Sequence, residues 1–523
     1  MEIDRNRNLI KVFNNELDTE QNRINIFGSG IEYLDYFHPY SGDLDFFGNF
    51  SVFNRINRAV TFEGKEIIAK WLMGYDFKKD QISQRHEAVN ELSDMNSFME
   101  DFLNCFFIGK ELPDESIGIK VWLNKFPKVT KYGKYGKYLL MLSTIVLLSL
   151  IVLSFSINGI FPILFTGLII SFAVNLRFKK KIDIIHNHAS RQAELFRKYV
   201  DLLDLIDKNG FSAFLLNQLK QNLTSNNKFR NELIKIASII RKLDYRLNFM
   251  AGPFLNVLFF WDLHHCIKLA DWIGKNRHEF DDWLSDIGKF DALVTIACLK
   301  FNNPDWCFPV LGNDNKLYIN ALNMGHPLIN NCVANDYSIS GEGKFDIVTG
   351  SNMAGKSTFL RSLGVNIVLG MAGFPVKASF FEFTPTNILS YMRINDSIEL
   401  ELSTFHAELD KIKRILDFVR INDKTFLLLD ELLRGTNTRD RQTGSTALIQ
   451  QLIKNKASGI VATHDLNLTD LETKLPGKIR NYNFSIQTVN EELYFDYKLK
   501  SGVCNTFNAA LLMKKIGIDI LED

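Results

Sequence analysis

The sequence lacks three features that would each point to a particular class of protein. Its six cysteines are scattered and contain no C-x-x-C pair, which fits a reducing compartment and argues against a cysteine-bound zinc site. No charge sign dominates, since 61 Lys and Arg face 60 Asp and Glu, so the chain is not a globally basic nucleic-acid coat. The N-terminus contains no apolar h-region, so no cleavable secretion signal is visible.

Charge is also missing from one long stretch inside the chain. Residues 138–157 contain no charged residue, and a helix of this length is about 30 Å long, the thickness of a bilayer core. After the turn signal Asn158-Gly159, residues 160–176 form a second uncharged stretch. Residues 138–176 therefore predict a two-helix transmembrane hairpin. The alternative is a helical hairpin buried in a soluble core.

Basic and aromatic residues flank this predicted hairpin on both sides. They are Lys131, Tyr132, Lys134, Tyr135, Lys137 and Tyr138 before it and Arg177, Lys179, Lys180 and Lys181 after it. A two-span hairpin places both flanks on one side of the membrane, and the positive-inside rule makes that side cytoplasmic. We therefore expect the inner (cytoplasmic) membrane as the location.

The residues on either side of the hairpin read as helices. Residues 46–130 begin with a helical apolar face, and residues 177–300 read as long amphipathic helices in which Leu195, Tyr199 and Leu202 keep a spacing of three to four. Their polar faces carry basic residues that are either a nucleic-acid surface or only solvated side chains. These are Lys220, Lys228, Arg230, Lys235, Arg241, Lys242 and Arg246.

A phosphate-binding pattern appears after residue 301, where strands and helices alternate. Residues 345–349 read as a buried strand, and an apolar helix comes after the pattern Gly-x-x-x-x-Gly-Lys-Ser. Glycines let backbone N–H groups turn toward phosphate oxygens, the lysine adds a charge at the β- and γ-phosphates, and the serine coordinates Mg²⁺. The predicted nucleotide contacts are Gly350, Ser351, Asn352, Met353, Ala354, Gly355, Lys356, Ser357 and Thr358.

Two further strands end in polar residues that suit ATP hydrolysis. The strand TFLLLDE ends at Asp430, which with Ser357 is predicted to hold Mg²⁺, and at Glu431, which can deprotonate the attacking water. The strand SGIVATH ends at His464, which can sense or stabilise the γ-phosphate. A capped turn and a satisfied structural histidine are the alternatives.

These segments together resemble one known family. GSNMAGKST, LLLDELLRGTNTRD and VATHD are similar to the ATPase domain of the MutS family of DNA mismatch-repair proteins. His326-Pro327 and Asn335-Asp336 resemble the beginning of that domain, and Arg434-Gly435-Thr436 resembles the family's Arg-Gly-Thr. More faintly, NRINRAVTFEGKEIIAKWL with Arg85-x-x-x-Val89, and WLSDIGKFDALVTIA, resemble the start and return of the family's lever domain.

The resemblance implies a homodimer with sites between subunits. Ser403, in a Ser-Thr-Phe segment like the family's, would reach the partner's nucleotide, and the C-terminal YKLKSGVCNTFNAALLMKKIGI resembles a helical tail across the ATPase dimer. The family's mismatch-reading and connector domains have no room before residue 45, and a hydrophobic hairpin interrupts the lever region. ABC transporters share the ATPase logic, but no Ser-Gly-Gly-Gln signature occurs.

The sequence thus predicts an α/β P-loop ATPase domain of MutS/ABC type, C-terminal to a mostly helical lever domain with a transmembrane hairpin. The predicted segments are 1–45 (N-terminal), 46–130 (helical core), 138–176 (hairpin), 177–300 (levers), 301–495 (ATPase) and 496–523 (helical dimerisation tail). The expected function is ATP–Mg²⁺ hydrolysis that moves the lever helices, with binding of mismatched or branched DNA, on the cytoplasmic face of the membrane. The alternative is a membrane-tethered ATPase switch that acts on a protein partner without DNA.

Overall fold

The computed structural model divides the chain into two compact units. It describes residues 2–21, 23, 27–74, 78–107, 119, 122–123, 126, 133–190, 192–312, 316–351, 353–392, 404–489 and 492–504. The helical unit comprises residues 1–11, 59–67 and 95–292, and the sheet unit comprises residues 12–58, 68–94 and 293–523. Each unit collects segments far apart in the sequence, so each is described by itself.

The helical unit is built from long helices, as the amphipathic spacing predicts. The helices that lie wholly within it are α5 (Asn96–Phe107), α7 (Gly133–Ser154), α8 (Phe161–Ala189), α9 (Gln192–Lys208), α10 (Phe214–Thr224), α11 (Lys228–Leu243) and α12 (Ala251–Phe259). Helices α1 (Glu2–Glu20), α3 (Phe62–Met73) and α13 (Trp261–Asn302) contribute residues to both units. The apolar stripe of α9 is buried at Tyr199, Leu202 and Ile206, which is the face that the spacing predicts.

Two buried carboxyl groups tie distant helices together in this unit. Asp291 on α13 accepts hydrogen bonds from the N–H of Thr61 (2.7 Å), its hydroxyl (2.6 Å) and the N–H of Val60 (3.3 Å). Tyr199 donates to Glu63 at 2.5 Å. Burial raises the pKa of Asp291 to about 6 and that of Glu63 to about 7.

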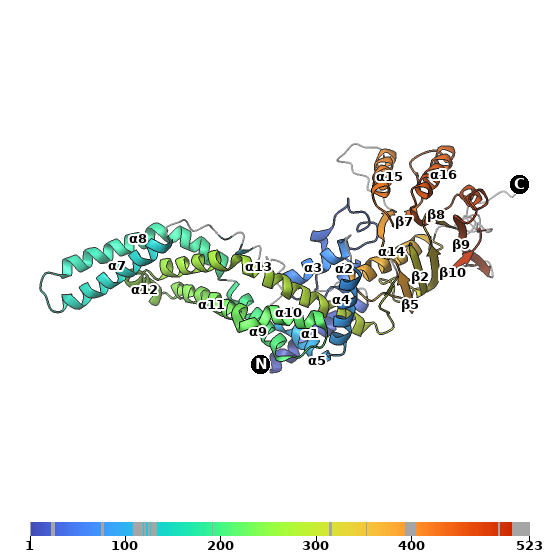
Figure 1. Ribbon diagram of the computed structural model, residues 1–523. Coiled ribbons are helices and arrows are strands. Elements are labelled where there is room, and N and C mark those ends of the chain that lie inside the picture. Colours follow the sequence, from blue (N-terminus) through green and yellow to red (C-terminus); the bar gives the residue numbers. More distant parts are fainter. Residues whose placement is uncertain are drawn as a thin grey trace. The chain divides into compact units, whose positions relative to one another are not determined.

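Helices α7 and α8 form the hairpin that the uncharged stretches predict, and they run side by side (Figure 1). Helix α8 continues past the predicted end of the second stretch at Leu176, so Arg177 and the lysines after it belong to the same helix. Most of their large apolar side chains point outward, with Tyr138 70%, Ile145 56% and Ile169 52% exposed. Both helices are long and apolar enough to cross a membrane.

The sheet unit holds the predicted strands. Its six-stranded sheet has the order β10-β9-β4-β8-β7-β6, with bounds β4 (Phe345–Gly350), β6 (Asn387–Tyr391), β7 (Thr425–Asp430), β8 (Ser458–Thr463), β9 (Ile479–Val489) and β10 (Glu492–Ser501). Only β10 runs antiparallel to its neighbour among these pairs. Strands β4, β7 and β8 are buried along their whole length, which explains their continuous apolar sequences.

A second sheet and several helices complete this unit. The order β1-β5-β2-β3 joins β1 (Val310–Leu311), β2 (Tyr318–Met324), β3 (Asn335–Ser340) and β5 (Phe380–Phe383). The helices are α2 (Val52–Ile56), α4 (Lys79–Ser93), α14 (Lys356–Ala372), α15 (Thr404–Ile421), α16 (Thr438–Lys454) and α17 (Leu471–Lys474). Helices α15 and α16 pack Ile412, Ile415 and Ile449 into one core with β7 and β8 residues.

The prediction of a helical tail from residue 496 is wrong for its first part. Residues 496–501 complete β10, whose side chains alternate between apolar Phe495, Tyr497 and Leu499 and the charged residues between them. An alternation with a period of two is typical of a β-strand, and this segment pairs with β9 in the sheet. Residues 505–523 lie outside the described ranges.

Candidate functional site

The carboxyl ends of three neighbouring strands bring the predicted site residues together. Strand β8 lies between β4 and β7, and all three run parallel, so the loops after them meet at one edge of the sheet. A cavity of about 520 Å³ opens at this edge. Lys356, Ser357, Asp430, Glu431 and His464 all line it.

The loop after β4 has the conformation that its glycines permit. Gly350, Met353 and Gly355 have φ values of 150°, 67° and 104°. A Cβ atom on Gly350 would lie 2.6 Å from the carbonyl oxygen of Phe484, so a larger residue does not fit there. Helix α14 begins at Lys356 and directs its free N–H groups and its dipole toward the loop.

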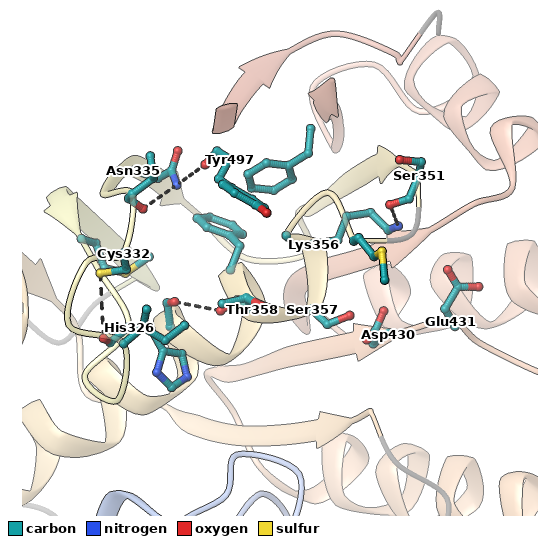
Figure 2. Close-up of a pocket in the computed structure, with 18 of the residues that line it drawn as sticks. His326, Cys332, Asn335, Ser351, Lys356, Ser357, Thr358, Asp430, Glu431 and Tyr497 are labelled. Atoms are coloured by element: carbon teal, nitrogen blue, oxygen red, sulfur yellow. Dashed lines mark hydrogen bonds between the residues drawn. The ribbon is translucent and has the colours of Figure 1, made fainter. Parts of the chain in front are cut away.

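Lys356 lies at the centre of the site. Its ammonium group donates to the carbonyl oxygen of Ser351 (3.1 Å), as Figure 2 shows, and to that of Gly350 (2.8 Å). It also lies 3.2 Å from Nε2 of His464. Burial lowers its pKa, while the nearby carboxylates of Glu431 and Asp430 act in the opposite direction. A phosphate group would offer this lysine a better partner than neutral carbonyls, because hydrogen bonds between two charged groups are the stronger ones.

Asp430 and Ser357 supply oxygens suited to a magnesium ion. In Figure 2 the two side chains point toward one another across the loop. Oδ1 of Asp430 is buried and accepts no hydrogen bond within the described part of the chain. A buried carboxylate oxygen without a hydrogen-bond donor costs free energy unless a bound cation balances its charge. Carboxylate and hydroxyl oxygens are ligands that Mg²⁺ prefers. The residues present therefore fit the ion.

Glu431 comes directly after Asp430 in an uncommon backbone conformation. Its φ is 52°, in the left-handed region, and its N–H donates to the carbonyl of Ala462 on β8 at 3.0 Å. This turn directs the carboxylate toward His464, whose Nε2 lies 3.4 Å from Oε1 of Glu431. Strained conformations of this kind persist where the surroundings enforce them, and they gather at functional sites.

The surroundings of His464 favour its neutral form. Burial lowers its pKa most, and the charge of Lys356 adds to this effect, while Glu431 raises the pKa. A neutral imidazole beside Glu431 and Lys356 can donate one hydrogen bond without competing for the anions that the lysine binds.

Two aromatic residues that line the cavity, Phe484 and Tyr497, have no predicted role in the site. His326 and Asn335, which the sequence connected only with the beginning of the ATPase domain, line the cavity as well. Asn335 donates to the carbonyl of Tyr497 (3.0 Å) and accepts from the N–H of Leu499 (2.8 Å), across an irregularity in the β9–β10 pairing. The irregularity turns Tyr497 toward the cavity, as bulges beside active sites do. The alternation of apolar and charged residues along 495–500 was the signal that could have revealed this strand.

Of the other predicted contacts, Met353 is 81% exposed and Ala354 is buried within the loop. Thr358 comes after Ser357 on α14, and its carbonyl accepts the hydroxyl of Ser362. Asn352 and Ser403 lie outside the residues that the structure describes. The structure thus brings most of the predicted site residues together. The cavity is lined by Ser351, Met353, Gly355, Lys356, Ser357, Thr358, Asp430, Glu431 and His464, and Gly350 accepts a hydrogen bond from Lys356.

Taken together, the strand–loop–helix, the lysine and the acidic strand end define a P-loop nucleotide site. Comparison with known proteins makes this more specific. Residues 346–516 match the family MutS domain V. MutS domain V is an ATPase domain, so this part of the chain is an ATPase domain that is similar to the one in MutS proteins.

The curated relatives agree with this match. The chain is 29% identical over 259 residues to a DNA mismatch repair protein MutS of Thermotoga maritima, covering 48% of this chain and 31% of the relative. It is 32% identical over 243 residues to that of Aquifex pyrophilus, covering 45% of this chain and 27% of the relative. To human MutS protein homolog 4 it is 33% identical over 186 residues, covering 34% and 20%. The match thus spans less than a third of the length of these relatives.

Proposed function

We propose that the site hydrolyses ATP and that each predicted residue contributes one step. Lys356 and the N–H groups at the start of α14 bind the phosphates, and Ser357 and Asp430 hold Mg²⁺. The ion, when bound, neutralises charge on the phosphate oxygens. Glu431 orients the attacking water and takes its proton, and His464 donates a hydrogen bond near the γ-phosphate. The convergence of Lys356, Asp430 and Glu431 on one cavity carries this proposal.

Substitution of the lysine tests the phosphate site. Lys356→Ala removes charge-assisted hydrogen bonds to phosphate, and ATP affinity should fall roughly 100-fold. Lys344→Ala is the matched control, because Lys344 lies just before the opposite end of the same strand, β4. Unchanged ATP affinity in Lys356→Ala, measured by titration with a fluorescent ATP analogue, would remove the lysine from its role.

We further propose that the hairpin anchors the protein in the inner membrane with the ATPase domain in the cytoplasm. The observation that supports an anchor over a buried hairpin is exposure. In the uncharged windows of α7 and α8 only 6% and 11% of the residues are buried. Exposed apolar surface of this extent needs a cover. The full chain should float with phospholipid vesicles in a density gradient and stay with them in high salt.

The resemblance also supports a homodimer through the ATPase domain, with Ser403 reaching the partner's phosphate. Because residues from both subunits would then enclose each ATP, dimers should accumulate when hydrolysis is blocked. Sedimentation of Glu431→Gln with and without ATP tests this, and a monomer under both conditions contradicts it. Hydrolysis in such a dimer would move the lever helices.

DNA is the first ligand to consider for these helices, since the curated relatives in the comparison are named DNA mismatch repair proteins. The basic residues of the helical unit favour the alternative, a switch acting on a protein partner. Lys228 pairs with Glu279 (2.6 Å), Arg230 with Asp204, and Arg246 with Asp183 (2.6 Å) and Asp262 (3.0 Å). Lys235 pairs with Glu232, and Lys220 donates to two backbone carbonyls.

Only Arg241 and Lys242 of that predicted set carry no such partner within the described ranges. A protein that binds DNA through the set would have to break several ion pairs first, while two free cations give only weak, salt-sensitive affinity. Titration with duplex, mismatched and branched DNA at low and moderate salt separates the two functions. Tight binding that Arg241→Ala with Lys242→Ala abolishes supports DNA, and no binding at low salt supports the protein partner.

A further inference from the structure

A third apolar segment lies against the hairpin and has no place in the proposed function so far. Residues 247–261 contain no charged residue, and they form the end of a short 3-10 turn (Asp244–Leu247) and helix α12. Helix α12 contacts both α7 and α8 (Figure 1). Its nine residues give a length of about 14 Å, too short to span a bilayer.

The apolar side chains at the start of this segment are directed to solvent. Leu247 is 71%, Phe249 94%, Met250 84% and Phe254 62% exposed. Together they continue the exposed apolar surface of α7 and α8, on which Leu139, Ile145 and Ile169 are also more than half exposed. A patch of this kind in a water-soluble protein would be an aggregation hazard.

Side chains satisfy several of the backbone polar groups at both ends of α12. At the start, Oδ1 of Asn248 accepts from the N–H groups of Met250 (3.1 Å) and Ala251 (3.0 Å). At the other end, Ser171 donates to the carbonyl of Val257 (2.5 Å), and Asn175 donates to that of Asn256 (2.9 Å). Free N–H and C=O groups at helix ends are tolerable in water but cost several kcal/mol each in hydrocarbon.

Ser171 and Asn175 are therefore informative, because they are polar residues inside the uncharged stretch of α8. The Ser171 side chain is almost fully buried, and both residues hydrogen-bond to α12. They lie within two turns of Arg177, the first basic residue after the stretch. This places their contact with α12 within roughly 10 Å of the flanking charges, the depth at which interfacial helices lie.

Three lysines lie near one another beside this assembly. Burial and the charges of Lys242 and Lys137 lower the pKa of Lys268 on α13, which places the three ammonium groups in one region. Lys137 precedes the apolar stretch of α7, and Lys242 lies in the last turn of α11, shortly before the α12 segment. Cations next to an exposed apolar surface suit an anionic lipid surface.

We infer that residues 247–259 insert into the cytoplasmic leaflet beside the hairpin, as a third membrane element that does not span. This inference rests on the proposed membrane anchor. Continuity with the exposed faces of α7 and α8, the capped ends of α12 and the lysines beside it all favour a bilayer as the occupant over a protein surface. Helix α12 then stabilises the cytoplasmic half of the hairpin by packing against it.

Site-specific photocrosslinking in vesicles tests this with the full chain. A photoreactive residue replaces Phe249, Ile169 of the hairpin, or Phe214 of α10, in vesicles of phosphatidylethanolamine and phosphatidylglycerol. Phe214 is the matched control, because it is an aromatic residue of the same unit that is 63% exposed. Lipid adducts should form at positions 169 and 249 and not at 214.

The outcomes separate the anchor from the third element. Adducts at 169 without adducts at 249 keep the anchor and overturn this inference. Adducts of 249 to a second copy or to another protein also overturn it. No adduct at 169 removes the anchor itself, and this inference with it. In a second variant, Ser171→Ala with Asn175→Ala uncaps α12, and it should lower the lipid yield at 249 several-fold while leaving that at 169 unchanged.

Discussion

The two units treat apolar sequence in opposite ways. Strands β4, β7 and β8 of the sheet unit and the uncharged stretches of α7 and α8 in the helical unit are both mostly apolar, yet the strands are buried throughout and the stretches are largely exposed. The strands are covered by the protein's own helices, while within the described part of the chain α12 covers only part of the hairpin. Apolar composition therefore predicts that a segment is removed from water, but it does not distinguish a protein interior from a lipid bilayer.

Two buried carboxylates, one from each unit, differ in their hydrogen bonds. Asp291 in the helical unit accepts three hydrogen bonds from Thr61 and Val60, with both of its oxygens engaged. Asp430 in the sheet unit keeps an oxygen without a donor. Glu63 and Asp262 of the helical unit also keep a buried oxygen without a donor among the described residues. What distinguishes Asp430 as a candidate ligand is therefore that it lines the cavity beside Ser357 and Lys356.

The largest effect should come from charge placed on the hairpin. Ile145→Arg with Ile169→Arg puts two cations near the middle of the two stretches, each costing about 3 kcal/mol on insertion. This variant should no longer float with the vesicles in a density gradient. Phe214→Arg with Ile234→Arg, exposed positions on α10 and α11, should still float. If the hairpin variant floats as well, a bilayer does not account for the exposed apolar side chains of the hairpin. The proposed contrast between strands buried in protein and helices buried in lipid would then be wrong.

A smaller effect concerns the buried acid Glu63. Its pKa is raised to about 7, so its protonated form stabilises the fold at low pH, and this stabilisation is lost as the pH rises through about 7. The full chain in detergent should thus unfold at lower urea concentration at pH 8 than at pH 5, by a few kcal/mol in free energy. Glu63→Gln should reduce this dependence and leave the part that comes from Asp291, while Glu66→Gln should leave the whole dependence in place. An unchanged slope in Glu63→Gln would assign the pH dependence elsewhere.

The smallest effect belongs to Tyr497 on the far wall of the nucleotide cavity. Tyr497→Ala should weaken ATP binding about tenfold if the ring stacks on the base. Tyr494→Ala, on the same strand but outside the cavity, is the control. Equal affinity for ATP in both variants, measured by titration, would show that Tyr497 only closes the cavity.

Much of the sheet unit could be predicted from the sequence, because its main elements depend on short, local sequence patterns. A buried parallel strand leaves a continuous apolar run, and the P-loop pattern determines the loop and the helix start after it. Strands β4, β7 and β8 were therefore predicted correctly, and the structure brings residues predicted at their ends to one cavity. The partnership of Asn335 with Tyr497 could not be read, because the two residues are 162 positions apart and meet only through a strand irregularity.

Two other elements were not predicted from the sequence, for different reasons. Residues 496–501 alternate as a strand does, but the resemblance to a helical tail outweighed this pattern. Helix α12 is too short for a membrane-span pattern, and its apolar residues surround it without a polar face. Its significance depends on the capping by Ser171 and Asn175, which lie more than 80 positions earlier in the sequence.

The role of Glu431 is the central claim of this account, and phosphate release tests it most directly. The full chain in vesicles is compared with Glu431→Gln, and with Glu342→Gln as a control outside the cavity. Loss of a general base should lower the turnover rate about 100-fold or more while ATP still binds. Full turnover in Glu431→Gln, with ATP bound as in the parent protein, would contradict the assignment of the catalytic site.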